Sequence, residues 1–211
     1  MKKHPSVRAG QRHFLLLATS FFATLAFGQQ SCLTPIYNRG TPKQAFVTEV
    51  TNWAKTAPDS VFTTNANADI YTLVKPKLAP KGWRGLAHRK AAMLEALIVL
   101  GGYESSWDWS EGIDVTNPSS SKCPNTEAGI FQTSANSMAF NVSLKTLTAS
   151  ACGAIDCKTF QRCTKSNHSF AIGYTALLLR YTTRHHGPLI RKGDVYAHLR
   201  LQCMLDLEKL L

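Results

Sequence analysis

One carboxyl group in this 211-residue chain has the surroundings that acid catalysis requires. Glu104 follows a long apolar stretch and stands between the aromatic residues Tyr103 and Trp107. An apolar setting takes water away from a carboxylate and raises its pKa above the ordinary value of about 4.3. A carboxyl that keeps its proton near neutral pH can protonate a leaving oxygen, so this position predicts a general acid. The alternative is a solvated glutamate in the last turn of a helix.

Two further segments accompany Glu104. Ser105 and Ser106 follow it directly, and their hydroxyls can bind the carboxyl, the helix end or a substrate. The segment Gly129-Ile-Phe-Gln132 comes after a polar loop. The Gln132 amide offers a donor and an acceptor to a sugar, and Gly129 lets the backbone approach a ligand closely. The alternative for this segment is a turn that faces the core.

These segments resemble those of the soluble lytic transglycosylases and goose-type lysozymes, which belong to the lysozyme-like superfamily. The resemblance rests on Gly101-Gly-Tyr-Glu-Ser-Ser-Trp107 and, beyond the loop, on Glu127-Ala-Gly-Ile-Phe-Gln-Thr-Ser134. In those proteins the glutamate is the general acid and the glycine-glutamine segment forms the wall of the cleft. The resemblance therefore implies an enzyme that cleaves β-1,4 glycosidic bonds of peptidoglycan, with Glu104 as its acid.

A second carboxylate decides the outcome of such a reaction. A hydrolase places a base or nucleophile near the acid, whereas in a transglycosylase the C6 hydroxyl of the substrate attacks and closes a 1,6-anhydro ring. Goose-type lysozymes carry auxiliary acids in the interval between the glutamate and the glycine-glutamine segment. Here that interval contains Asp108, Glu111, Asp114 and Glu127. We expect Asp114 or Glu127 to act, with Glu127 preferred because it adjoins the wall segment. Ordinary loop charges are the alternative.

Aromatic residues near these segments can offer ring faces to sugars. Trp107, Trp109 and Phe131 are the candidates, although a core position is commoner for tryptophan. The Ala-Tyr-Asn-Ala-Gly signature of transglycosylases is absent, and we expect Tyr174 in Ile172-Gly-Tyr-Thr175 to take the place of its tyrosine. This departure favours hydrolysis. A transglycosylase, a chitinase-like glycosidase and a catalytically inactive glycan-binding protein stay open as alternatives.

Apolar residues at helical spacing predict the elements that hold these groups. The expected helices are 44–54, 88–103, 169–185 and a last one from 194 onward. The second of them delivers Glu104 at its end. Residues 58–85 are expected to form a loop with at most a short helix at 70–74, and residues 105–127 a long loop. No segment alternates convincingly, so the predicted fold is mainly α, a lysozyme-like single domain with a long catalytic loop.

Residues 1–28 are expected to form a secretory signal peptide. Lys2, Lys3, Arg8 and Arg12 precede an apolar stretch that is too short to span a bilayer of roughly 30 Å. Removing 28 of the 211 residues leaves 183, which suits one catalytic domain over 29–211. The sequence thus predicts a secreted or periplasmic enzyme without a stable membrane anchor.

All six cysteines follow residue 28: Cys32, Cys123, Cys152, Cys157, Cys163 and Cys203. An even count in an exported chain predicts three disulfides, and the sequence leaves their pairing open. The spacing matches no zinc motif, so neither a metal nor another cofactor is expected.

The charge of the chain indicates an anionic partner. Without the four lysines and arginines of residues 1–28, the 24 basic residues become 20 against 13 acidic ones, and the net charge falls from +11 to +7. A basic field favours anionic polymers. For an exported protein we expect peptidoglycan or a related amino-sugar glycan rather than nucleic acid. A bacteriolytic enzyme of this kind would also have a proteinaceous inhibitor or immunity protein as its partner.

Overall fold

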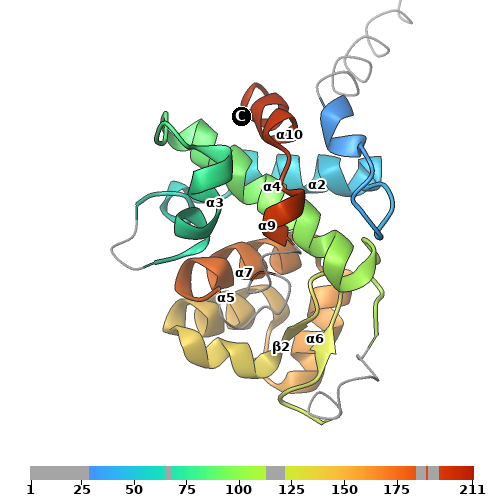
Figure 1. Cartoon of the computed structure of the whole chain (residues 1–211). Helices are drawn as coiled ribbons and strands as arrows, with labels where there is room; N and C mark the ends of the chain where they lie inside the picture. The colour runs from blue at the N-terminus through green and yellow to red at the C-terminus, as the bar shows by residue number, and fades with distance from the viewer. Residues whose placement is uncertain (1–28, 65–67, 113–121, 184–188, 190–194) are drawn as a thin grey trace, which may run out of the picture.

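The computed structural model describes residues 29–64, 68–112, 122–183, 189 and 195–211, and these residues are mainly helical (Figure 1). The expected signal peptide lies outside this part of the chain. None of the helices in the described ranges is long and apolar enough to cross a membrane.

The described helices and strands follow one another in a simple order. The α-helices are α2 (Gln44–Thr56), α3 (Ile70–Leu78), α4 (Leu86–Ser105), α5 (Val142–Cys152), α6 (Cys157–Ser166), α7 (His168–Tyr181), α9 (Val195–His198) and α10 (Leu201–Glu208). Short 3-10 helices span Gln30–Leu33, Asp59–Val61 and Ala135–Phe140. The strands β1 (Glu127–Ala128) and β2 (Thr133–Ser134) form one antiparallel hairpin, in which Glu127 stands opposite Ser134.

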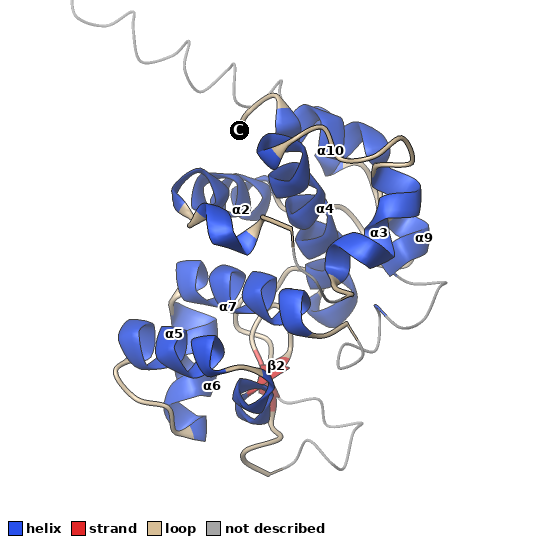
Figure 2. Ribbon diagram, turned by 90° about the vertical axis from the view of Figure 1, so that its left-hand side faces the viewer, coloured by secondary structure: helices blue, strands red, loops and turns tan. Residues whose placement is uncertain are grey.

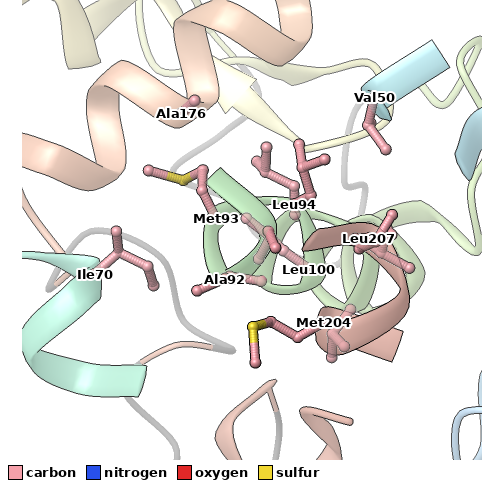
Figure 3. Close-up of a cluster of buried hydrophobic side chains, with 14 of the residues drawn as sticks. Val50, Ile70, Ala92, Met93, Leu94, Leu100, Ala176, Met204 and Leu207 are labelled. Atoms are coloured by element: carbon pink, nitrogen blue, oxygen red, sulfur yellow. The ribbon is translucent and has the colours of Figure 1, made fainter. Parts of the chain in front are cut away.

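Helix α4 forms the centre of the main core. Every residue from Ala91 to Gly102 is buried, because the helix is apolar on nearly all sides and must be covered on all of them. Val50 of α2, Ile70 of α3, Ala176 of α7 and Leu207 of α10 belong to the cluster that surrounds it (Figure 3). The cover becomes partial in the last turn of α4, where Tyr103 and Glu104 are partly exposed.

A second, smaller core joins α5, α6 and α7. Phe160 of α6 packs edge-on against Tyr174 of α7, with 4.9 Å between ring centroids, and Phe170 meets both rings. Figure 2 shows α7 between the group of α2 and α4 on one side and α5 and α6 on the other. Helix α7 therefore belongs to both cores and connects them.

Three disulfides confirm the predicted framework and leave no free cysteine. Cys32–Cys203 joins the segment before α2 to α10. Cys123–Cys157 joins the segment before β1 to the start of α6, and Cys152–Cys163 joins α5 to α6. Such bridges are typical of chains that fold in an oxidising compartment.

The single C-terminal helix expected from residue 194 onward is instead two helices with a break at Arg200. The backbone of Arg200 is extended, and its N–H donates to Glu95 Oε1 at 2.6 Å. Its guanidinium also binds the Glu95 carboxylate, which lies fully buried on α4. Burial raises the pKa of Glu95, and the neighbouring guanidinium opposes that rise. The break thus supplies the partners that a buried carboxylate requires.

We expect Arg200→Met to lower the free energy of unfolding by about 3 to 5 kcal/mol, because it leaves a buried carboxylate without its cation. Urea denaturation measures the loss. Arg84→Met is the matched control, since the Arg84 side chain is 57% exposed in its pair with Glu208 and should cost at most about 1 kcal/mol. Equal losses for the two variants would contradict this account of the break.

Candidate functional site

Glu104 lies in the last turn of α4, and it is partly exposed although Ser105 beside it is buried. The chain turns sharply after it, since Ser106 and Trp107 both adopt left-handed φ values, of 53° and 61°. The Trp107 ring folds back over α4 and donates from Nε1 to Ile98 O at 2.8 Å. A Cβ at Gly102 would lie 2.5 Å from that ring, so only glycine allows this packing.

The segment Gly129–Gln132 forms the turn between β1 and β2. Gln132 has a positive φ of 44°, and both its backbone N–H and its side-chain amide donate to Gly129 O, at 3.0 and 2.9 Å. Gln132 is buried. The amide that we expected to bind a sugar therefore uses part of its donor capacity to close its own turn.

The absence of a side chain at Gly129 permits a close contact with α6, whereas we expected a close contact with a ligand. Gly129 has a φ of +73°, and a Cβ placed there would lie 2.8 Å from the backbone oxygen of Thr164 on α6. The close approach that this glycine permits is therefore to α6 and not to a glycan. The turn and α6 are packed against each other at this point.

A hydrogen bond joins the end of α4 to the hairpin turn. Ser105 Oγ donates to Ile130 O at 2.9 Å, and the N–H of Gly129 donates to Glu111 O at 3.1 Å. The two segments that carried the family resemblance thus lie side by side. Of the four non-glycine residues with positive φ in the described part of the chain, three lie here: Ser106, Trp107 and Gln132. Sparsely populated backbone conformations of this kind cluster at functional sites.

Two of the aromatic rings proposed to contact sugar lie in the core. Trp107 is 2% exposed and Phe131 is 1% exposed, so in the described structure neither presents a face to a sugar, contrary to our expectation. Trp109 is half-buried. One face of its ring stacks on His168 at 3.7 Å, and its ring also meets Phe46 and Phe131 at steep angles. The three rings therefore support the candidate site by packing against neighbouring residues of the core.

Tyr174 also lies in the core. It is fully buried between Phe160 and Phe170, and its hydroxyl shares a 2.7 Å hydrogen bond with Ser137, just beyond β2. Burial raises the pKa of Tyr174 to about 12. The expected contact of this tyrosine with substrate is absent from the described arrangement, where it supports the segment after the hairpin.

The acids between the two segments differ in their surroundings. Glu127 is partly exposed on β1, beside the turn. Asp108 accepts hydrogen bonds from the backbone and hydroxyl of Ser110, which hold its pKa below the ordinary value, and it lies on the surface. Asp114 lies outside the described residues. The choice between Glu127 and Asp114 as second carboxylate stays a prediction.

The structure adds a pair that the sequence did not suggest. His168 Nδ1 lies 2.6 Å from Glu49 Oε2, so the ring that stacks on Trp109 is also tied to α2. The two residues are 119 positions apart, and no local pattern connects them. They fix Trp109, and through it the segment after Glu104, against α2 and α7.

Among the described residues, one group of side chains has the spacing of metal ligands: Cys32, Glu95 and Cys203. The two thiols form a disulfide and the carboxylate binds Arg200, so this group does not suit an ion.

No protein-family model, curated protein or solved structure matches this chain. The assignment of function therefore depends on the residues of the site.

We expect Gly129→Ala to destabilise the protein more than Gly153→Ala, by about 1 to 3 kcal/mol. Both glycines have positive φ, so both variants strain the backbone. Only Gly129 also lacks space for a methyl group. At Gly153 nothing lies within 4 Å of an added Cβ. Thermal unfolding of the two variants gives the comparison, and equal stability would refute the tight packing of the turn on α6.

Proposed function

We propose that this protein is a glycosidase that cleaves β-1,4 bonds of peptidoglycan, with Glu104 as its general acid. The observation that carries the proposal is the Ser105 Oγ to Ile130 O hydrogen bond. It ties the helix end that bears Glu104 to the Gly129–Gln132 turn, and in lysozyme-like enzymes the matching segments form the acid and the cleft wall. Three residues with strained backbone at the same place support a functional role.

The position of Glu104 suits an acid. A carboxylate at the C-terminal end of a helix meets the negative end of the helix dipole, which favours the neutral carboxyl. The side chain is partly exposed and so within reach of a ligand. Ser105 and Trp107 anchor the backbone that follows Glu104, which fixes the point from which its side chain leaves the helix.

In the proposed reaction, Glu104 donates its proton to the glycosidic oxygen as the bond to the anomeric carbon breaks. A water molecule then attacks that carbon, and Glu127 takes the proton that the water loses. The products are a free hydroxyl on the leaving sugar and a reducing end on the other. An inverting hydrolase needs roughly 6.5 to 9.5 Å between its two carboxyls to hold the water.

The setting of such an enzyme follows from its substrate. Three disulfides and a basic charge suit secretion toward an anionic cell wall. Residues 1–28 then serve as the export signal. An enzyme that lyses bacteria would be paired with a proteinaceous inhibitor or immunity protein.

We expect Glu104→Gln to reduce the rate of peptidoglycan lysis by about 10² to 10⁴, because an amide keeps the shape but cannot donate the proton. The rate is followed as the loss of turbidity of purified cell walls. Glu111→Gln is the matched control, since Glu111 lies in the same region and accepts only the N–H of Gly112 through its carboxylate among the described contacts. Full activity of a folded Glu104→Gln variant would remove the central residue of the proposal.

The second carboxylate gives a separate prediction. If water is the nucleophile, Glu127→Gln should lower kcat by at least about 10². Asp108→Asn, at an exposed carboxylate that binds Ser110, should leave kcat nearly unchanged. Should Asp114→Asn abolish turnover while Glu127→Gln does not, Asp114 takes the role. If all three variants stay active, the C6 hydroxyl of the substrate is the nucleophile instead.

A further inference from the structure

Helix α6 carries a row of cations beside the hairpin. Lys158, Arg162 and Lys165 stand at positions i, i+4 and i+7, which lie on one face of a helix. With Ala128 of β1 and Gln161 they line a pocket of about 380 Å³. Ala128 directly follows Glu127, so the pocket begins one residue away from the preferred second carboxylate.

The charges of this row are only weakly balanced within the described part of the protein, where Lys165 is the smallest of the contributions that lower the pKa of Asp108. Lys158, Arg162 and Lys165 form no ion pair with a described carboxylate, and Arg162 donates to the hydroxyl of Thr159. The nearby Asp156 caps the helix by accepting the N–H of Thr159 at 3.0 Å. Like charges at this spacing repel one another, and an anion placed between them relieves the repulsion.

The row is held rigidly against the candidate site. Cys123–Cys157 ties the start of α6 to the segment before β1, and Cys152–Cys163 ties the helix to α5. Gly129 seats the hairpin turn on Thr164, and the Gln161 amide reaches Thr126 O at 3.5 Å. Two disulfides and two contacts to backbone oxygens thus fix the cations relative to the hairpin before any ligand arrives, and such preorganisation lowers the cost of binding.

We propose that this face of α6 binds the carboxylates of the peptide side chains that peptidoglycan strands carry. The inference rests on the proposed function and narrows its substrate class. The Arg162 guanidinium can bind a carboxylate through two parallel hydrogen bonds, and the two lysines add point charges on either side. A neutral sugar polymer offers these cations no partner. The enzyme accordingly selects peptide-bearing strands over uncharged strands with the same β-1,4 linkage.

The test measures binding to purified sacculi in the Glu104→Gln background, so that the walls stay intact. The sacculi are freed of phosphate polymers, and in half of them the carboxylates are converted to neutral amides with a carbodiimide and methylamine, which leaves the peptide crosslinks in place. The variant is Lys158→Ala with Arg162→Ala and Lys165→Ala. The control removes three other exposed lysines, Lys55, Lys81 and Lys145, and so lowers the net charge equally.

Each exposed ion pair changes a binding constant by about 1.5- to 5-fold, so the α6 variant should lose about tenfold in affinity for peptide-bearing sacculi. It should bind amidated sacculi as tightly as the parent does. An equal loss in the control variant, or equal binding of the parent to both kinds of sacculi, would overturn the inference. Because the assay measures binding and not turnover, a chain that passes it but lyses no walls would refute the proposed function alone.

Discussion

The burial of α4 is the constraint on which the rest of the structure depends. A helix that is apolar on nearly all sides has no broad face for water, so α2, α3, α7 and α10 each cover part of it. Glu95 is the one charged residue in its buried run, and its need for partners explains the break before α10. The helix meets solvent again at its last turn, and Glu104 is partly exposed because it lies there.

The same constraint explains which elements could be predicted from the sequence. The apolar spacing predicted α2 and α4 to within two residues of their ends, and both predictions are confirmed. Helix α7 begins one residue before the expected start and ends at Tyr181, four residues before the expected end. Helices α5 and α6 were not predicted. They bury few residues, and α5 is rich in serine and threonine, which favour helices weakly.

Site residues were harder to predict, because residue type does not determine burial. The sequence indicated that the segments around Glu104 and Gln132 belong together, and they lie side by side through Ser105 and Ile130. It could not show that Trp107 would bond to Ile98 across the end of its own helix, which places the ring in the core. Gln132 likewise forms a hydrogen bond within its own turn, and Gly129 packs closely on α6. No local sequence pattern specifies either contact.

The central claim is that Glu104 drives cleavage of β-1,4 bonds in peptidoglycan. Mass spectrometry of the fragments released from purified peptidoglycan tests it most directly, because it identifies both the bond broken and the new chain end. The account predicts disaccharide-peptide fragments with reducing ends from the natural protein and none from Glu104→Gln. Fragments lighter by one water would mean that Glu104 still acts as the acid, but that the C6 hydroxyl of the substrate, and not water, is the nucleophile. Intact glycan strands after prolonged incubation with the folded natural protein would contradict the account.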